Sequence, residues 1–413
     1  MNTLYIGIDL SLKVNQIAIL DTNGKQLASF SVNNDKDGAE LLREKIITKG
    51  KSMEITTIKI GMEATNLYWW HLHRFLQTDE KLHKAFTEVV VYTINPMLVK
   101  RFHKAYAQLD KTDPIDAMVI ADFVRFGKLN LSHLIDEVYE PLKRLTRFRY
   151  HMVSQLTASE NYFINHLFLK YSSWQKVKPF SCAYGLTAAS IITEYDTEEL
   201  LQVPLTELAE RLMAFSVNTL SDPEKTGKLL KQVVSSSYLL EKKFQEPVDI
   251  VLTNTYENIK YFTKQIQTID KVIEKEFKKY PNTLMTIPGI GLVYAAGITA
   301  EIGNVSSRFA NQNQVAKYAG LAWTRKQSGE SESEETPQKH GNTYLSHYLV
   351  EAANSLRIHN ALYKTYYEKK VKEVPKHQHK RALVLTARKL VRLCVAMLRE
   401  QRLYQPDGQR KEL

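Results

Sequence analysis

Four acidic side chains in the first third of the sequence have the types and spacing that metal-dependent phosphodiester chemistry needs. Asp9 interrupts the apolar run LYIGIDL, Glu63 follows the apolar run ITTIKIGM, and Asp113 and Asp116 stand three residues apart in KTDPIDA. Divalent ions that act on phosphodiesters take hard oxygen ligands, and a pair of ions needs carboxylates from several elements. Spacing of three residues places Asp113 and Asp116 on one face of a helix.

Each acid also has a purely structural interpretation. Asp113, followed by Pro114 and by Asp116 three places later, resembles a helix N-cap, a proline at the first helical position and a capping-box acid. Asp9 could simply end a strand, and Glu63 could be an exposed acid at the start of a helix. An unpaired carboxylate in an apolar strand costs several kcal/mol of folding free energy. This cost favours a functional role for the four acids.

The elements around these acids predict an α/β domain. Alternating apolar runs flank the Thr22-Asn23-Gly24 turn, and an Asn-Gly pair between such runs is a strong hairpin signal. A helical stretch at about 37–49, the run at 55–62, a helix after Asn66 and the strand TEVVVYTI follow. This order is that of an RNase H-like fold, with Asp9 at the centre of the first strand and Glu63 at the end of the fourth.

The middle of the chain is predicted to be helical. Ile259, Phe262, Ile266, Ile269 and Ile273 repeat with the three-four spacing of a coiled-coil seam, which indicates a spacer or a dimer arm. A long helix packed on its own domain is the alternative. Prolines are expected to break this region at Pro223 and Pro247. We therefore expect three domains, at 1–141, 142–280 and 281–413, the last mainly helical.

A polar segment of the third region, Thr324 to Tyr348, contains Ser328 in a Ser-Gly pair, and its hydroxyl is one candidate nucleophile. A Ser-Gly pair in a polar loop is usually only a turn. A serine hydroxyl becomes a good nucleophile when a base or a metal ion activates it, so Ser328 would have to meet the metal-binding acids. Ser331 and Ser333 are rival nucleophiles in the same segment.

The charge balance predicts a polyanionic partner. The chain of 413 residues has 56 Lys and Arg against 45 Asp and Glu, and most of the excess lies between Lys364 and Leu413. A solvated helical face and a phosphate-binding surface both explain that excess. The segment KRLTRFRYHM, from Lys143 to Met152, combines cations that can pair with phosphates and rings that can stack on bases. Buried rings beside solvated arginines are the alternative interpretation.

The two cysteines are far apart, and the sequence shows neither a membrane-length apolar run nor a signal-peptide pattern. We therefore expect a cytoplasmic protein with no membrane partner.

Several motifs together resemble one family. They are GIDLSLKVNQIAIL, GMEAT, the INP that begins before Met97, KTDPIDA, IPGIG, KYAGLAW, and QSG followed by GNTYL. This set is similar to that of the DEDD-type transposases of bridge-RNA-guided insertion sequences, which are relatives of the Piv-type DNA invertases. The resemblance covers roughly 1–150 and 280–360.

The resemblance implies a RuvC-like N-terminal domain in which Asp9, Glu63, Asp113 and Asp116 bind Mg²⁺, as two ions. It also implies that Ser328 is the nucleophile of DNA strand exchange between donor and target. A noncoding bridge RNA would guide the reaction, and the protein would act as a dimer or tetramer. Two alternatives remain: a junction-resolving nuclease that uses metal-activated water, and a non-catalytic nucleic-acid-binding protein.

Overall fold

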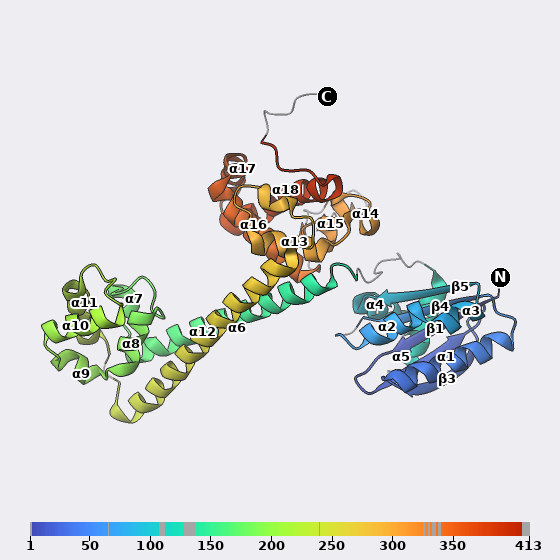
Figure 1. Cartoon of the computed structure of the whole chain (residues 1–413), viewed down its shortest axis with the longest axis horizontal. Helices are drawn as coiled ribbons and strands as arrows, with labels where there is room; N and C mark the ends of the chain where they lie inside the picture. The colour runs from blue at the N-terminus through green and yellow to red at the C-terminus, as the bar shows by residue number, and fades with distance from the viewer. Residues whose placement is uncertain are drawn as a thin grey trace. The chain divides into compact units, whose positions relative to one another are not determined.

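The computed structural model describes residues 2–64, 66–106, 112–127, 137–238, 240–324, 327–328, 331–332, 336–337 and 340–406. The chain divides into two compact units, one up to residue 136 and one from residue 137 onward (Figure 1). The first is a mixed α/β domain and the second is mostly helical, as the sequence predicted.

A five-stranded sheet forms the centre of the N-terminal unit, with strand order β3-β2-β1-β4-β5. Its strands are β1 (Thr3–Asp9), β2 (Val14–Leu20), β3 (Gln26–Asn33), β4 (Thr57–Glu63) and β5 (Glu88–Ile94). The first three are antiparallel neighbours, whereas β4 is parallel to both β1 and β5. Parallel pairing of β1 with β4 brings their carboxyl ends, Asp9 and Glu63, to the same edge of the sheet.

One expectation about the first strand is wrong. Asp9 is the last residue of β1, opposite Gln16 of β2, and does not lie at the strand centre. Its half-buried position at the strand end lets the carboxylate reach solvent and neighbouring elements. The central positions are taken instead by fully buried residues such as Ile6.

Helices cover both faces of this sheet. They are α1 (Lys36–Lys51), α2 (Trp69–Thr78), α3 (Glu80–Ala85), α4 (Pro96–His103) and α5 (Asp113–Phe126). Residues of α1, α2 and α3 share one hydrophobic core with the sheet, and residues of α4 and α5 form a smaller cluster with Ile94. Helix α5 therefore packs on the face of the sheet opposite to α1, α2 and α3.

Two glycines allow α5 to lie directly on the sheet. A Cβ atom at Gly7 would stand 2.0 Å from the Ala117 carbonyl oxygen and 2.3 Å from the Ala121 nitrogen. A Cβ atom at Gly61 would stand 2.3 Å from a methyl carbon of Val124. Each glycine lies two residues before an acid, and side chains two apart on a strand share a face. The face that admits α5 is therefore the face that presents Asp9 and Glu63.

Two long antiparallel helices, α6 (Glu140–Lys170) and α12 (Lys242–Phe277), run through the second unit (Figure 1). The predicted seam lies between them: Ile259 shares a core with Phe163, and Ile273 shares one with Leu142. The seam is thus filled from the same chain, as the alternative interpretation predicted. A dimer arm stays a prediction.

The expected break at Pro247 is wrong, because this proline lies inside α12. It stands only six residues into the helix, where the loss of one backbone hydrogen bond and the clash with the carbonyl four residues earlier affect a single early turn. Pro223 is the first residue of a helix, α11, and so does mark a boundary.

The remaining helices pack at the two ends of this pair. Between α6 and α12 the chain forms α7 (Trp174–Val177), α8 (Leu186–Glu194), α9 (Thr197–Gln202), α10 (Leu205–Phe215) and α11 (Pro223–Ser236). After α12 come a 3₁₀ helix (Thr283–Thr286), α13 (Leu292–Ile302), α14 (Val305–Arg308), α15 (Gln312–Tyr318), α16 (Thr343–His359), α17 (Ala361–Lys372) and α18 (Gln378–Glu400). Among the described residues, no helix is both long and apolar enough to cross a membrane.

Replacing Gly7 with Ala should destabilise the N-terminal unit by about 1–3 kcal/mol or more, because the added carbon meets backbone atoms of α5 that cannot move independently. Scanning calorimetry of the full chain measures the change. Gly185→Ala is the control, since a Cβ atom there would lie at an ordinary 3.5 Å from the Cys182 carbonyl oxygen. Equal unfolding temperatures for the two variants would contradict the prediction.

Candidate active site

The four predicted acids come together at one edge of the N-terminal sheet. Asp9 and Glu63 end the parallel strands β1 and β4, and α5 begins with Asp113 and Asp116. Burial, together with the negative charges of Asp116, Asp113 and Glu63, raises the pKa of Asp9 from 3.8 to about 6. The three other carboxylates are thus close enough to Asp9 to repel its charge.

The capping-box interpretation of KTDPIDA is wrong. The N-cap of α5 is Thr112, in extended backbone conformation, and Asp113 is the first helical residue. A capping box needs its acid three residues after the N-cap, whereas Asp116 stands four residues after Thr112. Both carboxylates lie in the first turn, where the helix dipole favours negative charge.

His103 is a fifth polar group at this edge, and the sequence reasoning missed it. It is the last residue of α4, and its Nε2 atom lies 3.0 Å from a carboxylate oxygen of Asp116. Both side chains are largely buried. No spacing rule relates a histidine on one helix to an acid on the next, so only the packing of α4 against α5 reveals the pair.

The donor chemistry of this edge fits a divalent cation. Four carboxylates supply hard oxygen ligands, and their mutual repulsion at Asp9 is the electrostatic situation that a bound cation relieves. Within the described residues, no three Asp, Glu, His or Cys side chains converge closely enough to form a ligand set. Ligation would therefore require side-chain rotations at an edge already made by β1, β4 and α5.

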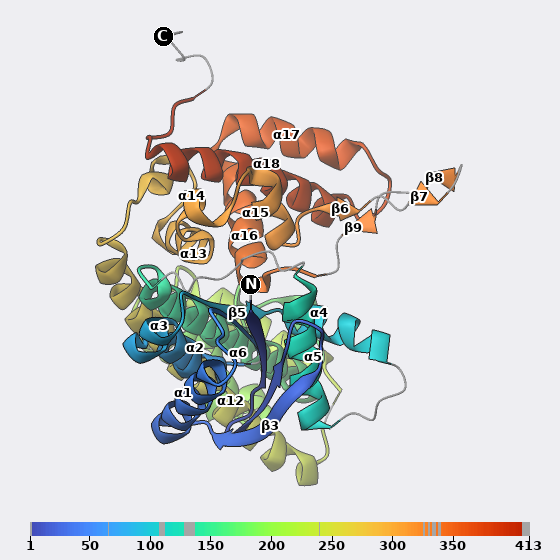
Figure 2. The ribbon, with the colours of Figure 1, turned by 90° about the vertical axis from the view of Figure 1, so that its right-hand side faces the viewer.

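In the second unit, Ser328 lies on a small β-hairpin. Strand β6 (Trp323–Thr324) pairs with β9 (Thr336–Pro337), and β7 (Gln327–Ser328) pairs with β8 (Ser331–Glu332). Figure 2 shows β7 and β8 beyond β6 and β9, farther from α13 to α18. Ser328 stands opposite Ser331. The predicted nucleophile thus belongs to a strand.

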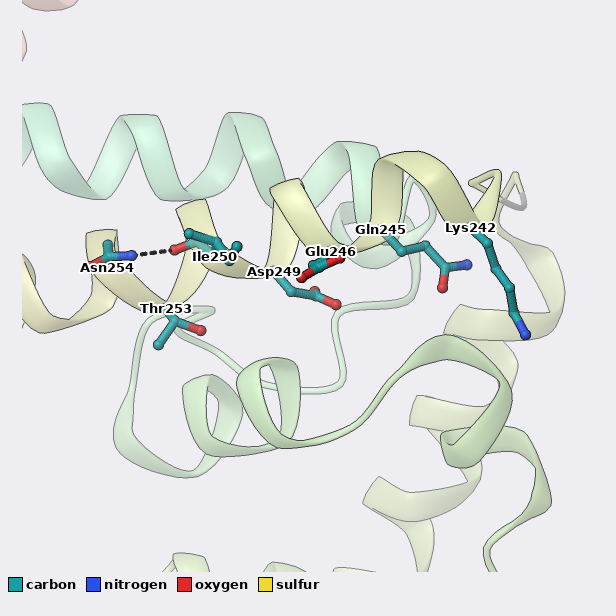
Figure 3. A pocket seen from close by; sticks show the side chains of 7 residues that line it. All are labelled: Lys242, Gln245, Glu246, Asp249, Ile250, Thr253 and Asn254. Atoms are coloured by element: carbon teal, nitrogen blue, oxygen red, sulfur yellow. Dashed lines mark hydrogen bonds between the residues drawn. The ribbon is translucent and has the colours of Figure 1, made fainter.

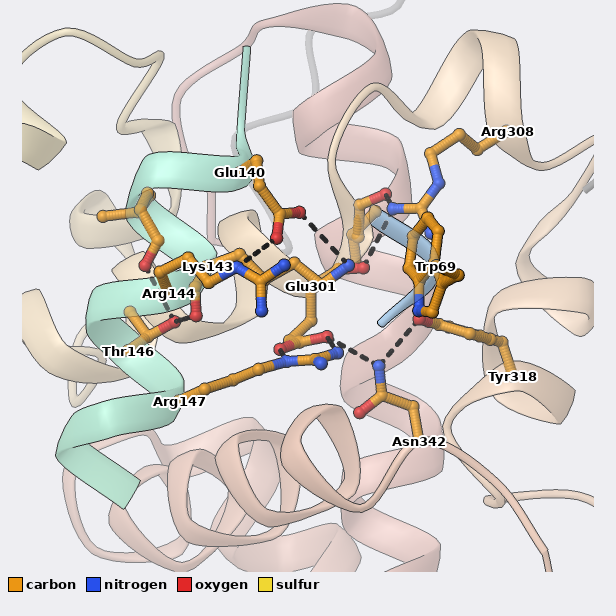
Figure 4. A network of polar contacts seen from close by, with 12 residues as sticks. Trp69, Glu140, Lys143, Arg144, Thr146, Arg147, Glu301, Arg308, Tyr318 and Asn342 are labelled. Atoms are coloured by element: carbon orange, nitrogen blue, oxygen red, sulfur yellow. Dashed lines mark hydrogen bonds and ion pairs between the residues drawn. The ribbon is translucent and has the colours of Figure 1, made fainter. Parts of the chain in front are cut away.

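A buried polar network lies at the base of this hairpin (Figure 4). The Glu301 side chain, on α13, is fully buried and accepts hydrogen bonds of 2.6 and 2.9 Å from the Arg147 guanidinium of α6. The Asn342 amide donates to the same carboxylate at 2.6 Å. The sequence reasoning missed Glu301, because a lone glutamate in the apolar helix LVYAAGITAEI carries no motif.

The basic-aromatic segment at 143–152 takes part in internal ion pairs. Arg147 pairs with Glu301, and Arg149 pairs with Asp270 of α12 at 2.5 Å. Arg144 pairs with Glu140 one helical turn away. Arg147 and Arg149 hold α6 against its neighbours, which is a structural use that neither earlier interpretation contained.

An open groove runs along the start of α12, and none of the predicted site residues lines it (Figure 3). It is lined by Lys242, Gln245, Glu246, Asp249, Ile250, Thr253 and Asn254. Asp249 is engaged by the buried Lys170 ammonium of α6 at 2.7 Å. The groove offers no nucleophile with an adjacent base among its described lining residues.

Comparison with known proteins identifies the class of enzyme to which the chain belongs. A family model of DEDD-type transposases of the IS110 group matches residues 6–171, and a model described as transposase of the IS116/IS110/IS902 family matches residues 282–368. The first range contains all four acids and the second contains Ser328. Together the two models cover more than half of the chain, which is therefore a transposase, an enzyme class that cleaves and recombines DNA.

Curated relatives agree over most of the chain. An IS116 insertion-element protein of Streptomyces clavuligerus is 25% identical over 98% of this chain and 96% of its own length. An IS110 insertion-element protein of Streptomyces coelicolor is 24% identical over 75% of this chain and 76% of its own length. A putative mini-circle transposase for IS117, from the same organism, is 23% identical over 79% and 78%. The chain belongs to the IS110/IS116 family of transposases.

Replacing Asp9 with Asn should raise the free energy of unfolding of the metal-free protein near pH 7.5 by about 1–2 kcal/mol, allowing for solvent screening. The pKa of Asp9 is about 6 in the folded state and 3.8 in the unfolded state. Ionisation of Asp9 therefore lowers the free energy of unfolding as the pH rises from about 4 to about 6, and the free energy of unfolding stays lower above that range. Equilibrium denaturation should show a large difference at pH 7.5 and a small one at pH 4. An Asp9→Asn variant less stable than the wild type at pH 7.5 would contradict the prediction that ionised Asp9 destabilises the fold.

Proposed function

We propose that this chain excises and inserts an insertion sequence by metal-dependent, serine-mediated DNA strand exchange. The observation that supports the proposal is the gathering of Asp9, Glu63, Asp113 and Asp116 at one sheet edge, where burial and the charges of the other three carboxylates raise the pKa of Asp9. A chain with a net charge of +11 that concentrates acids at one place is well suited to bring cations and DNA phosphates together there.

The fold of the N-terminal unit is proposed to be RuvC-like, of the RNase H-like class. Its sheet order, β3-β2-β1-β4-β5, supports this, together with the antiparallel β1, β2 and β3 and the parallel β4 and β5. The acids at the ends of β1 and β4 and at the start of α5 support it further.

In this proposal the four carboxylates would hold two Mg²⁺ ions, which would supply Lewis-acid stabilisation of the phosphate and help to activate a nucleophilic hydroxyl. Ser328 is the nucleophile. Its hydroxyl oxygen forms a bond to phosphorus as the bond from phosphorus to the leaving deoxyribose oxygen breaks, and that oxygen takes up a proton in place of the one that the serine loses to solvent. His103, beside Asp116, helps to hold that carboxylate in place.

We further propose that a noncoding bridge RNA pairs with donor and target DNA, and that two or four copies assemble around them. The sequence resemblance and the basic C-terminal segment support this part of the proposal. Sequencing nucleic acid that co-purifies with the full chain tests it. A discrete transcript encoded beside the reading frame is the expected result, and random fragments would count against it.

The double variant Asp113→Asn, Asp116→Asn should lose strand exchange in Mg²⁺ by about 10²-fold or more, because both first-turn carboxylates of the cation site become neutral. An in vitro recombination assay with guide RNA, donor and target measures the loss. Asp122→Asn, a change on the same helix away from the acidic edge, is the control. Full activity of the double variant would refute the metal-site assignment.

Ser328→Ala should abolish covalent protein–DNA adducts while leaving nucleic-acid binding unchanged, since only the attacking oxygen is removed. Denaturing electrophoresis of labelled DNA detects the adduct. Ser331→Ala, opposite Ser328 in the hairpin, is the matched control and should keep the adduct. Adducts that survive Ser328→Ala would show that another group is the nucleophile. Cleavage without any adduct would favour metal-activated water as the nucleophile.

A further inference from the structure

The Glu301 carboxylate is a charge placed where water cannot reach it. It is fully buried within α13, whose mostly apolar sequence packs in the core of the second unit. A buried charge is tolerated when it is paired and fully hydrogen-bonded. Arg147 donates two hydrogen bonds to it and lies over the Tyr344 ring at 4.4 Å. Although burial opposes the charge of Arg147, its bonds to Glu301 hold its pKa above the usual value.

Asn342 links this buried pair to the hairpin that carries Ser328. Its Nδ2 atom donates to Glu301 at 2.6 Å and to the Tyr318 hydroxyl at 2.8 Å. Its Oδ1 atom accepts from the Leu345 nitrogen and so caps α16, and its own backbone nitrogen donates to the Tyr318 carbonyl. One side chain therefore joins α13, α15 and α16 at a single point.

That point is the base of the hairpin. Asn342 directly follows Gly341, and a Cβ atom at Gly341 would stand 2.3 Å from the Gly320 nitrogen and 2.5 Å from its Cα. Gly320 and Gly341 flank the segment that contains β6, β7, β8 and β9, so the two ends of this segment touch backbone to backbone. The paired strands β6 and β9 lie in the segment that begins and ends at this contact.

We propose that Glu301, Arg147 and Asn342 are positioning residues that set the direction of the Ser328 hairpin relative to the helices of the second unit. This inference rests on the proposed role of Ser328 as nucleophile. The buried charge pair fixes the orientation of the Asn342 amide, and Asn342 fixes where the returning strand of the hairpin enters α16. A small misplacement of a reacting group can cost large factors in rate, so a rigid anchor at the hairpin base has a direct chemical use.

Asn342→Asp is the decisive variant. It keeps the oxygen that caps α16, since Asp is as good an N-cap as Asn, but it replaces the amide donor with a second carboxylate facing Glu301. We expect faster hydrogen exchange in segment 318–342 and about tenfold slower formation of the Ser328 adduct, with unchanged nucleic-acid binding. Adding Glu301→Gln restores an amide–carboxylate pair in the reverse direction but gives up one of the two bonds from Arg147, so it should recover both readouts in part.

Asp270→Asn is the matched control, because it removes a comparable ion pair to Arg149 of α6 that has no bond to the hairpin base. It should leave the adduct rate and the exchange of segment 318–342 at wild-type values. If Asn342→Asp does not fold, Tyr318→Phe, which removes only one bond to Asn342, should show the same effects in weaker form.

Wild-type exchange and adduct rates in Asn342→Asp would overturn the inference. So would an equal loss of adduct in Asp270→Asn, which would mean that general destabilisation is the cause. If the wild-type protein forms no serine adduct at all, the proposed function fails, and the hydrogen-exchange comparison still decides whether the network fixes the hairpin.

Discussion

The N-terminal unit depends on one backbone contact, the approach of α5 to β1 at Gly7. No side chain fits between the strand and the Ala117 and Ala121 backbone, so the helix rests on the sheet itself. Because Gly7 and Asp9 share a face of β1, this contact also determines where the first turn of α5 lies relative to the strand ends. The position of Asp113 and Asp116 beside Asp9 and Glu63 is therefore a consequence of packing between small residues.

That arrangement has an energetic cost. Four carboxylates at one edge repel one another, and burial together with this repulsion raises the pKa of Asp9. The fold supplies compensation elsewhere, through an apolar core on the opposite face of the sheet and the favourable helix dipole at the start of α5. Destabilised charge clusters of this kind are typical of functional sites.

The second unit uses charge in the opposite way. Glu301 is buried with every carboxylate oxygen hydrogen-bonded, and its partners come from α6 and from the residue that ends the hairpin segment. A satisfied buried ion pair contributes less to stability than apolar packing does, but it strongly restricts orientation. A network of this kind restricts how the residues at the hairpin base are oriented.

The sequence by itself determined the α/β class, the order of the elements, the candidate acids and the helical seam, because these depend on local periodicity and on residue types. It placed Asp9 mid-strand, allowed a capping box as one interpretation of KTDPIDA and broke α12 at Pro247, because the exact end of a helix or strand depends on competition among neighbouring residues. Only the tertiary structure revealed His103 beside Asp116 and Glu301 beneath the hairpin. These contacts join residues on different elements, and no local pattern records which helices will pack together.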